Sequence, residues 1–215
     1  MDAIVENLDL YWLGFRTTLS LTLISAAIAL VVGTVLGAFR VSPSPPLRIF
    51  GAAYVEIVRN TPLTLVFIFF VFVAPQVGLI VPFFTSAVLA LSTYTAAFVC
   101  EAVRSGVNSV GTGQTEAARA IGLTFGGMLR LIILPQALRS VVPPLINIFI
   151  ALTKNSSVAG GFFVAELFGV ARRLANANPA DVIAVLIGVG VCYLAITIPA
   201  GILAGYVERK VAFAR

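Results

Sequence analysis

The stretch QTEAARAIGLTFGGMLRLIILPQALR, residues 114–139, begins polar and charged and then turns apolar in the middle of a strongly hydrophobic chain. The runs on either side of it carry little or no charge and are long enough to cross a bilayer, which takes about 20 residues. A segment with charges and glycines is costly inside a membrane. We therefore expect residues 112–135 to lie outside the bilayer and to connect two spans.

The composition places the chain among membrane proteins. Hydrophobic residues make up 60% of its 215 residues and charged residues only 11%, with a mean hydropathy of +1.05. A soluble domain carries about 25% charged residues, so this chain lacks the polar surface to face water on all sides. The net charge of +5 is spread between the apolar runs, a pattern that indicates membrane topology rather than nucleic-acid binding.

The residue types also limit the chemistry. The chain has no histidine, which excludes an imidazole metal site and a histidine proton relay, and we expect no bound metal. Both cysteines, Cys100 and Cys192, lie within apolar runs. This position predicts packing residues inside the membrane rather than a disulfide.

Hydropathy predicts an all-α membrane protein with five transmembrane helices in a single domain, residues 1–215. The candidate runs are residues 17–39, 60–100, 140–165 and 182–207. The second run is too long for one span, and Pro75, Gly78 and Pro82 predict a tight turn that divides it into two. Prolines and Lys154 interrupt the fourth of the five spans, which makes its ends the hardest to place.

The distribution of Lys and Arg predicts the orientation. With the N-terminus outside and the C-terminus in the cytoplasm, ten of the 14 basic residues lie on the inner side, in agreement with the positive-inside rule. These are Arg40, Arg48, Arg59, Arg104, Arg119, Arg130, Arg139, Arg209, Lys210 and Arg215. The acidic start of the chain, with Asp2, Glu6 and Asp9, lacks the positive region of a signal peptide, so we expect a retained first span.

Local signals predict two helices within the segment 112–135. Thr112 is expected to cap the first helix, with Glu116 in its first turn, where the helix dipole favours an anion. Gly122 is expected to end it. Thr124 is then expected to cap a second helix that runs to Pro135 and re-enters the membrane.

The apolar residues of the first of these helices are small. They are Ala117, Ala118, Ala120 and Ile121. An amphipathic helix that rests on lipid usually carries bulky Phe, Leu or Trp and several lysines, which this helix does not. Small side chains let another surface approach closely. We therefore favour a docking site for a protein partner over a lipid-bound helix.

The segment resembles the EAA loop in permease subunits of bacterial ABC importers. That pattern is Glu-Ala-Ala, three residues, Gly, nine residues and Ile-x-Leu-Pro, and it fits Glu116-Ala117-Ala118, Gly122 and Ile132-Ile133-Leu134-Pro135. The stretches VRNTPLTLVFIFF (58–70), LPQALRSVVPPLIN (134–147) and LTKNSSVA (152–159) are similar to the polar amino acid uptake branch. The resemblance implies the type I permease fold, five spans, an outside N-terminus and a bacterial inner membrane.

The resemblance also implies partners. Glu116, Ala117, Ala118 and Gly122 become coupling residues that dock in a cleft of a cytoplasmic ATPase. The chain has no GxxxxGK[ST] phosphate loop, so we expect no enzyme activity in it, and ATP with Mg²⁺ to be used by that partner. A second permease, identical or paralogous, and an extracellular amino-acid-binding protein complete the expected assembly.

A polar cluster in the fourth span is the first candidate for the substrate path. It consists of Thr153, Lys154, Asn155, Ser156 and Ser157, with Gly160 and Gly161 expected to loosen the helix after it. A charge at membrane depth is usually functional, although Lys154 could instead extend to the outer interface. The family often has Asp-Thr-Ser after this lysine. An amide at Asn155 repels an anionic solute less, which favours glutamate first and aspartate second, and KNSSVAGGFFVAEL (154–167) resembles actinobacterial glutamate permeases.

Other polar groups have a functional and a structural interpretation. Thr93, Tyr94 and Thr95 in the third span either line the path or form hydrogen bonds between helices. Glu101 and Arg104 are expected to pair near the inner face, and Arg59 and Pro62 belong to the Arg-x-Thr-Pro-Leu motif; all four are assigned to gating or structure. The outer loop could dock a delivery protein, although a solvated surface is favoured for each of its charged residues. These are Glu166, Arg172, Arg173 and Asp181.

Three alternatives remain open from the residues. The first is a permease of the same family for another polar amino acid, such as glutamine or a basic or neutral one. The second is a secondary carrier, which should have membrane acids for ion coupling and two repeated halves, whereas the spans are nearly free of acids and odd in number. The third is a membrane scaffold, which leaves the cluster around Lys154 unexplained.

Overall fold

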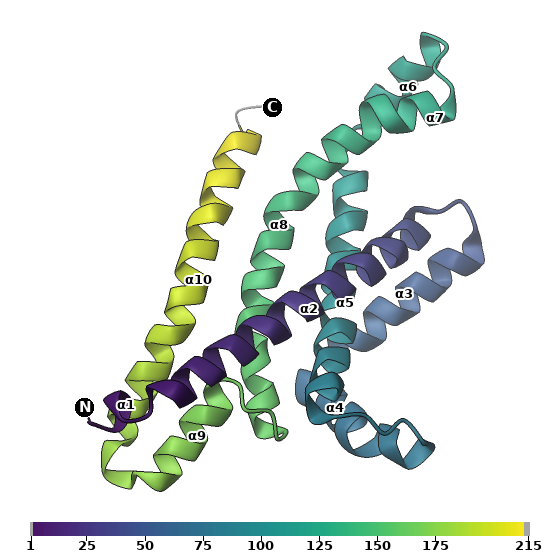
Figure 1. Cartoon of the computed structure of the whole chain (residues 1–215). Helices are drawn as coiled ribbons and strands as arrows, with labels where there is room; N and C mark the ends of the chain where they lie inside the picture. The colour runs from purple at the N-terminus through teal and green to yellow at the C-terminus, as the bar shows by residue number, and fades with distance from the viewer. Residues whose placement is uncertain (1, 213–215) are drawn as a thin grey trace.

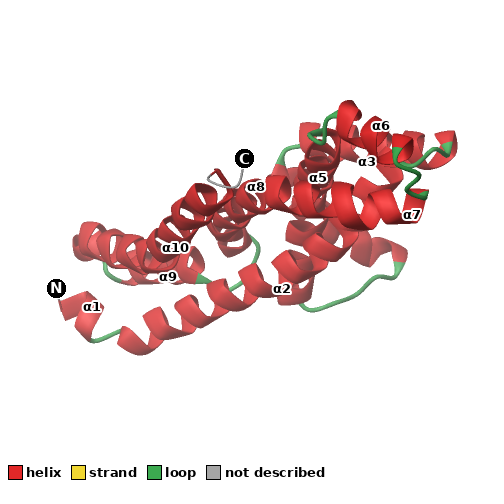
Figure 2. Cartoon of the chain, turned by 90° about the horizontal axis from the view of Figure 1, so that it is seen from above, coloured by secondary structure: helices red, strands yellow, loops and turns green. Residues whose placement is uncertain are grey.

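The computed structural model describes the backbone of residues 2–212 and the side chains of residues 4–210, and in this part of the chain every regular element is helical (Figures 1 and 2). The α-helices are α1 (Asp2–Val5), α2 (Leu8–Val41), α3 (Pro45–Asn60), α4 (Leu63–Ile68), α5 (Phe83–Asn108), α6 (Thr112–Ala120), α7 (Phe125–Met128), α8 (Leu134–Asn155), α9 (Leu167–Ala177) and α10 (Val182–Ala212). Short 3₁₀ and π turns join several of them.

Helix α2 is the first span and begins earlier than expected. It starts at Leu8 rather than near residue 17, because the acidic start of the chain remains helical, and it ends before Pro43. Gly33 lets it lie directly on α5. A Cβ at Gly33 would come within 2.7 Å of the Ala96 carbonyl oxygen and 2.5 Å of Val99 Cβ. Such glycines allow the close backbone approach that packs helices in membranes.

The second span is a bent pair of helices. Helix α3 begins at Pro45, where prolines in the first turn cost no hydrogen bond. It ends at Asn60 because Pro62 disfavours the helical conformation in Thr61, whose φ of −91° and ψ of 129° are extended. The helical segment Leu63–Val77 then leaves at an angle of 104° to α3. Four helices are long and apolar enough to span a membrane alone, and the predicted five spans are reached when the bent pair counts as one.

Helix α5 lies at the centre of the molecule. It packs against α2, α3, α4 and α8. Its apolar part is buried to a greater extent than that of the other three unbroken spans. Ala90, Leu91 and Ala96 on it are fully buried. The turn predicted before it is confirmed, because Gly78 has a φ of +92°, a conformation that glycine adopts without strain.

The fourth span is one continuous rod from Phe125 to Gly161. The expectation that a helix ends at Pro135 is therefore wrong. A π-helical turn, Leu129–Ile133, precedes the proline, and the Leu134 N–H donates to the Leu129 carbonyl, five residues back. The wider turn makes room for the proline ring and for its missing N–H, which would otherwise break an α-helix.

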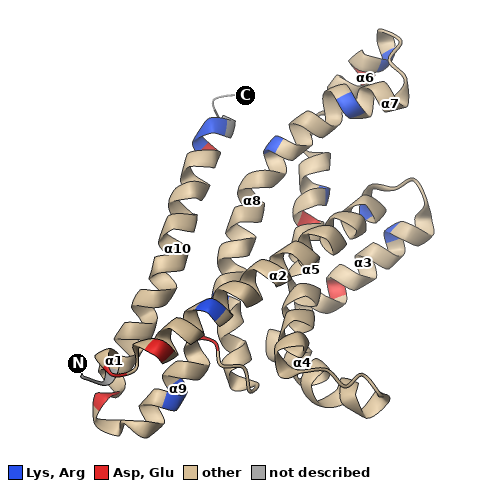
Figure 3. Cartoon of the chain, viewed as in Figure 1, with Lys and Arg blue, Asp and Glu red and all other residues tan. Residues whose placement is uncertain are grey.

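The two ends of the bundle differ. Helix α1 packs against α10 at one end, and α9 lies at the same end (Figure 1). The α6–α7 unit and the last turn of α10 lie at the other end (Figure 1). Charged residues lie mostly towards the helix ends, and the long middle of α10 has none (Figure 3). Both cysteines are free, as predicted, with Cys100 buried and Cys192 half-buried in the helix packing.

Candidate functional site

The α6–α7 unit projects from one end of the molecule (Figure 1). Two details of the prediction are wrong here. Gly111, with a φ of −59° and a ψ of 140°, is the N-cap, and Thr112 is already the first helical residue, because the chain makes its extended bend one residue earlier. Glu116 consequently lies beyond the first turn, which contains no acidic residue.

The end of α6 is a Schellman motif, as Gly122 predicted. Gly122 has a φ of +81°. The Leu123 N–H donates to the Ala118 carbonyl at 3.0 Å, and the Gly122 N–H donates to the Arg119 carbonyl at 2.9 Å. The prediction for Thr124 is also confirmed, since its hydroxyl accepts from the Gly127 N–H at 3.2 Å. The unit is therefore held by its own backbone bonds in a defined shape.

The exposed surface of this unit is only partly the one expected. Glu116 and Ala117 are exposed, but Ala118 is 1% exposed, because α6 packs with this side against the helical segment that follows. Bulky side chains stand out instead: Ile121 is 78% exposed and Phe125 70%. Such exposed apolar side chains at a projecting tip are typical of a surface that another protein covers.

A cluster of charges lies on α5. The predicted pair is confirmed: Arg104 donates to Glu101 through its Nε at 2.9 Å and through a second guanidinium nitrogen. A third member was missed, since Arg40 of α2 approaches Glu101 with an N···O distance of 3.7 Å. Arg59 of α3 lies over the Phe98 ring, 5.2 Å from its centre. Arg40 of α2, Arg59 of α3 and the Glu101–Arg104 pair of α5 thus lie in one region.

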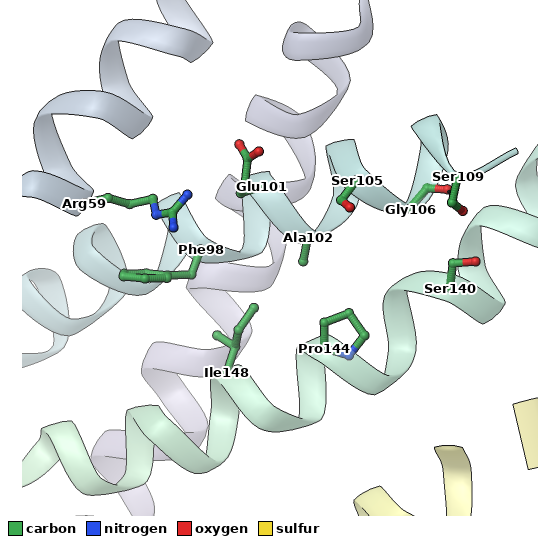
Figure 4. Close-up of a pocket in the computed structure, with 10 residues that line it drawn as sticks. All are labelled: Arg59, Phe98, Glu101, Ala102, Ser105, Gly106, Ser109, Ser140, Pro144 and Ile148. Carbon is green, nitrogen blue, oxygen red and sulfur yellow. Dashed lines mark hydrogen bonds between the residues drawn. The ribbon is translucent and has the colours of Figure 1, made fainter. Parts of the chain in front are cut away.

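Beside this cluster, α5 and α8 line a groove. A cavity of about 430 Å³ is lined by Arg59, Phe98, Glu101, Ala102, Ser105, Gly106, Ser109, Ser140, Pro144 and Ile148 (Figure 4). A smaller one of about 110 Å³ shares Phe98 and Ile148 with it and is lined by Tyr94, Thr95, Phe98, Ile148, Ala151, Leu152 and Asn155. Because α5 and α8 run in opposite directions, the groove follows both helices from the Tyr94–Asn155 end to the Ser109–Ser140 end.

The structure brings together only some of the predicted path residues. Asn155 and Tyr94 line the small cavity together, whereas Lys154 is exposed. The hydroxyls of Thr153, Ser156 and Ser157 donate to carbonyls three or four residues back in their own helix. The side chain of Thr93 is half-buried, and its carbonyl accepts from the Tyr54 hydroxyl at 2.7 Å.

Phe98, Ser105, Ser140 and Ile148 were not predicted as site residues. The spacing of these residues in the sequence could have identified them. Tyr94, Phe98, Glu101 and Ser105 recur every three or four residues. Ser140, Pro144, Ile148 and Asn155 follow at steps of four, four and seven residues, so each set lies on one helix face. The apolar character of Phe98 and Ile148 concealed this pattern.

Glu166 corrects another expectation. It is not a solvated loop residue but is fully buried, at 0% exposure. It caps α9, accepting from the Phe168 N–H at 2.9 Å and the Gly169 N–H at 2.7 Å, and it accepts from the Tyr193 hydroxyl of α10 at 2.7 Å. Burial raises the pKa of this carboxyl, and its hydrogen bonds oppose that rise.

Gly160 explains how the acid can be buried. A Cβ at Gly160 would collide with the Glu166 carboxylate and with the Gly169 backbone. The two glycines expected to loosen the helix therefore differ: Gly160 is buried and permits close packing, while Gly161 is exposed. Arg172 and Arg173 are exposed on α9, as expected of solvated charges, and Asp181 is half-buried before α10.

Comparison with known proteins identifies relatives of this chain. Residues 19–213 match the family model described as "Binding-protein-dependent transport system inner membrane component". The chain is 41% identical over 213 residues to the glutamate transport system permease protein GluC of Corynebacterium glutamicum, covering 93% of this chain and 92% of the relative. It is 39% identical over 210 residues to the probable glutamine ABC transporter permease protein GlnM of Bacillus subtilis, covering 98% and 97%.

Solved structures show the same architecture. The permease chain of an amino acid ABC transporter crystallised with histidines superposes with a TM-score of 0.90 at 29% identity, covering 96% of each chain. A chain of the inward-facing MetNI methionine transporter superposes with a TM-score of 0.77 at 22% identity, covering 95% of this chain and 97% of that one, and this likeness concerns the fold alone.

Proposed function

Because this chain belongs to the family of binding-protein-dependent transport system inner membrane components, we propose that it is the permease subunit of an ATP-driven amino acid importer, with glutamate as its first substrate. The glutamate transport permease of C. glutamicum, at 41% identity, supports this choice of solute. Asn155 supports it as well, because an amide in the small cavity adds no negative charge to repel an acidic amino acid.

The observation that carries the proposal is the projecting α6–α7 unit. Its shape is fixed by the Schellman turn at Gly122, and it presents Glu116, Ile121 and Phe125 to the outside. A rigid tip of this kind transmits a push or pull to the rod that begins at Phe125 and continues into the fourth span. This is the geometry that a coupling helix needs.

In the assembled importer, two permeases, identical or paralogous, enclose the path, and one cytoplasmic ATPase binds each α6 tip. An extracellular binding protein delivers the amino acid. ATP and Mg²⁺ act in the ATPases, and their closure moves the tips together and turns the path from inward-facing to outward-facing. The N-terminus of this chain lies outside the inner membrane and α6 inside, so Glu116, Ala117 and Gly122 meet the ATPase while Ala118 holds α6 to the chain itself.

A co-purification experiment tests the coupling. The chain is extracted in mild detergent beside a Glu116→Lys variant and a Glu208→Lys control, which makes the same charge change at an exposed acid near the end of α10. We expect an ATPase to co-purify with the parent chain and the control and to be lost from Glu116→Lys. If no ATPase co-purifies under conditions that keep membrane complexes intact, the importer proposal loses its main support.

A competition assay tests the solute. Uptake of labelled glutamate is measured in cells that carry the complete importer, with excess unlabelled glutamate, aspartate, glutamine or arginine. We expect the two acidic amino acids to compete best. Glutamine is the second candidate, because the B. subtilis relative at 39% identity is named a probable glutamine permease, and stronger competition by glutamine would replace glutamate with it.

A further inference from the structure

Three cavities meet at Phe98. It lines the large and the small cavity of the α5–α8 groove and a third cavity of about 280 Å³, where it is joined by Val55, Glu56, Arg59 and Asn60 of α3. Arg59 lines the large and the third cavity, and Ile148 lines the large and the small one. A solute that moves along the groove between the small and the large cavity therefore passes Phe98, with Arg59 beside it (Figure 4).

The guanidinium of Arg59 is available at this junction. Within the described part of the chain both ion pairs are formed by Glu101, with Arg40 and Arg104, and Arg59 takes part in neither. Its contact is the Phe98 ring, 5.2 Å from the guanidinium carbon. Stacking on an aromatic face fixes the plane of a guanidinium and leaves its N–H edge to bind an anion.

The charges around the junction favour an anion. Arg40 and Arg104 pair with Glu101, and Arg59 shares the large cavity with Glu101 and the third cavity with Glu56. Glu56 and Arg59 of α3 both line the third cavity, but the Glu56 carboxylate accepts from the Asn60 amide at 3.2 Å. Three cations against two carboxylates leave an excess of positive charge, which attracts anions strongly in a groove with apolar walls.

We propose that Arg59, held on the Phe98 ring, is a carboxylate-binding residue of the transport path, which takes a carboxylate of the amino acid as it moves between the small and the large cavity. A guanidinium binds a carboxylate through two parallel hydrogen bonds. The large cavity, at about 430 Å³, lies within the usual size of small-molecule sites, about 300–1,000 Å³. The nature of the solute in this inference rests on the proposed function; the anion site rests on the geometry.

Uptake by the complete importer in proteoliposomes tests the inference with Arg59→Gln, Arg59→Lys and the control Arg48→Gln. Arg48 is an exposed residue near the other end of α3. We expect Arg59→Gln to raise KM for glutamate about 10- to 100-fold with the complex still assembled, as the loss of a charged hydrogen bond does. Arg59→Lys should have a KM between those of the parent chain and Arg59→Gln, because lysine keeps the charge but lacks the planar guanidinium. If KM rises for glutamate alone, Arg59 binds the side-chain carboxylate. If KM rises equally for glutamine, Arg59 binds the α-carboxylate.

The role of Phe98 is a positioning one and has its own variants. Phe98→Leu removes the ring under the guanidinium, and Phe98→Tyr keeps it. We expect KM to rise in the first and to stay within about twofold in the second, since the cation–π contact survives. Equal KM values for both variants, or an unchanged KM in Arg59→Gln, would overturn the proposal, as would the same rise in Arg48→Gln.

A measurement of thermal stability in the presence of glutarate, a dicarboxylate without an amino group, tests the anion site separately from the proposed transport function. We expect glutarate to raise the Tm of the detergent-purified complex above a control of equal ionic strength, and the rise to disappear in Arg59→Gln. That result supports the site even if no amino acid is taken up, in which case only the proposed function fails. A glutarate-dependent rise that persists in Arg59→Gln overturns the site. If the complex with Arg59→Gln does not assemble, the same measurement is made on Arg59→Lys, for which we expect glutarate to raise Tm less than in the parent complex.

Discussion

Glu166 shows how a carboxylate is accommodated in a buried position at the end of a membrane bundle. Its partners are the second and third N–H groups of α9, those of Phe168 and Gly169, and the Tyr193 hydroxyl, all of them donors. The positive end of a helix dipole adds to these bonds. The same side chain therefore ties α9 to α10, while Gly160 holds the preceding turn against it.

Removal of this carboxylate should destabilise the protein strongly. Glu166→Ala leaves two N–H groups and a hydroxyl, all partly buried, without an acceptor, so we expect a loss of about 2–4 kcal/mol in the free energy of unfolding. For a chain of this size this corresponds to a fall in Tm of roughly 5–15 °C, measured on detergent-purified protein. Asp9→Ala, at an exposed acid of α2, is the control and should change Tm little. A fall of similar size in both variants would contradict the role of Glu166.

The same residue predicts a dependence of stability on pH. Burial raises the pKa of the Glu166 carboxyl in the folded protein, so the folded state holds this proton more tightly than the unfolded state. The stability that this proton contributes is complete below the ordinary pKa of glutamate, about 4.3. That contribution is lost as the pH rises through the folded pKa. Glu166→Gln carries no titrating proton and should therefore show a flatter decline of Tm with rising pH than the parent chain in this mildly acid window. Parallel curves for the two proteins would exclude the effect.

At the scale of elements, glycines set the distance between helices. Gly33 of α2 faces Ala96 and Val99 of α5, where a Cβ has no room, whereas Gly190 of α10 has nothing within 4 Å of its Cβ position. Gly33→Ala should therefore force α2 and α5 apart and cost about 1–3 kcal/mol. Gly190→Ala should be neutral or stabilising by up to about 1 kcal/mol through helix propensity. The Tm of the two variants in detergent checks this, and an equal response would show that the close packing of α2 on α5 does not limit stability.

Elements were predictable where a local rule decides them. The turn at Gly78, the Schellman end at Gly122 and the cap at Thr124 follow from short-range backbone preferences, and all three are found. Pro135 was misread because its effect depends on a π turn that begins six residues earlier. Glu166 was misread because its burial depends on Tyr193, 27 residues later, and hydropathy carries no information on such partners.

At the scale of the whole molecule, the five crossings place α1 and α6 at opposite ends (Figure 1). The charge-free runs predicted these crossings, because a span must satisfy its backbone and avoid charge. The 104° bend in the second crossing was not predictable from hydropathy, because the charge-free run begins at residue 60 and leaves α3 outside the predicted span. That bend brings Arg59 to the groove, so the candidate anion site depends on three-dimensional packing that the sequence pattern alone does not report.

The orientation of the bundle yields the last prediction. The excess of Lys and Arg on the α6 side predicts that this side lies in the cytoplasm. In a chain with Cys100→Ser and Cys192→Ser, a cysteine at exposed Val5 should react with an impermeant maleimide in intact cells. A cysteine at exposed Phe125 should react only after the membrane is permeabilised. Uptake assays of both cysteine variants show whether the labelled chains are assembled. The reverse labelling pattern would place the α6–α7 unit outside the cell, where no cytoplasmic ATPase could bind it.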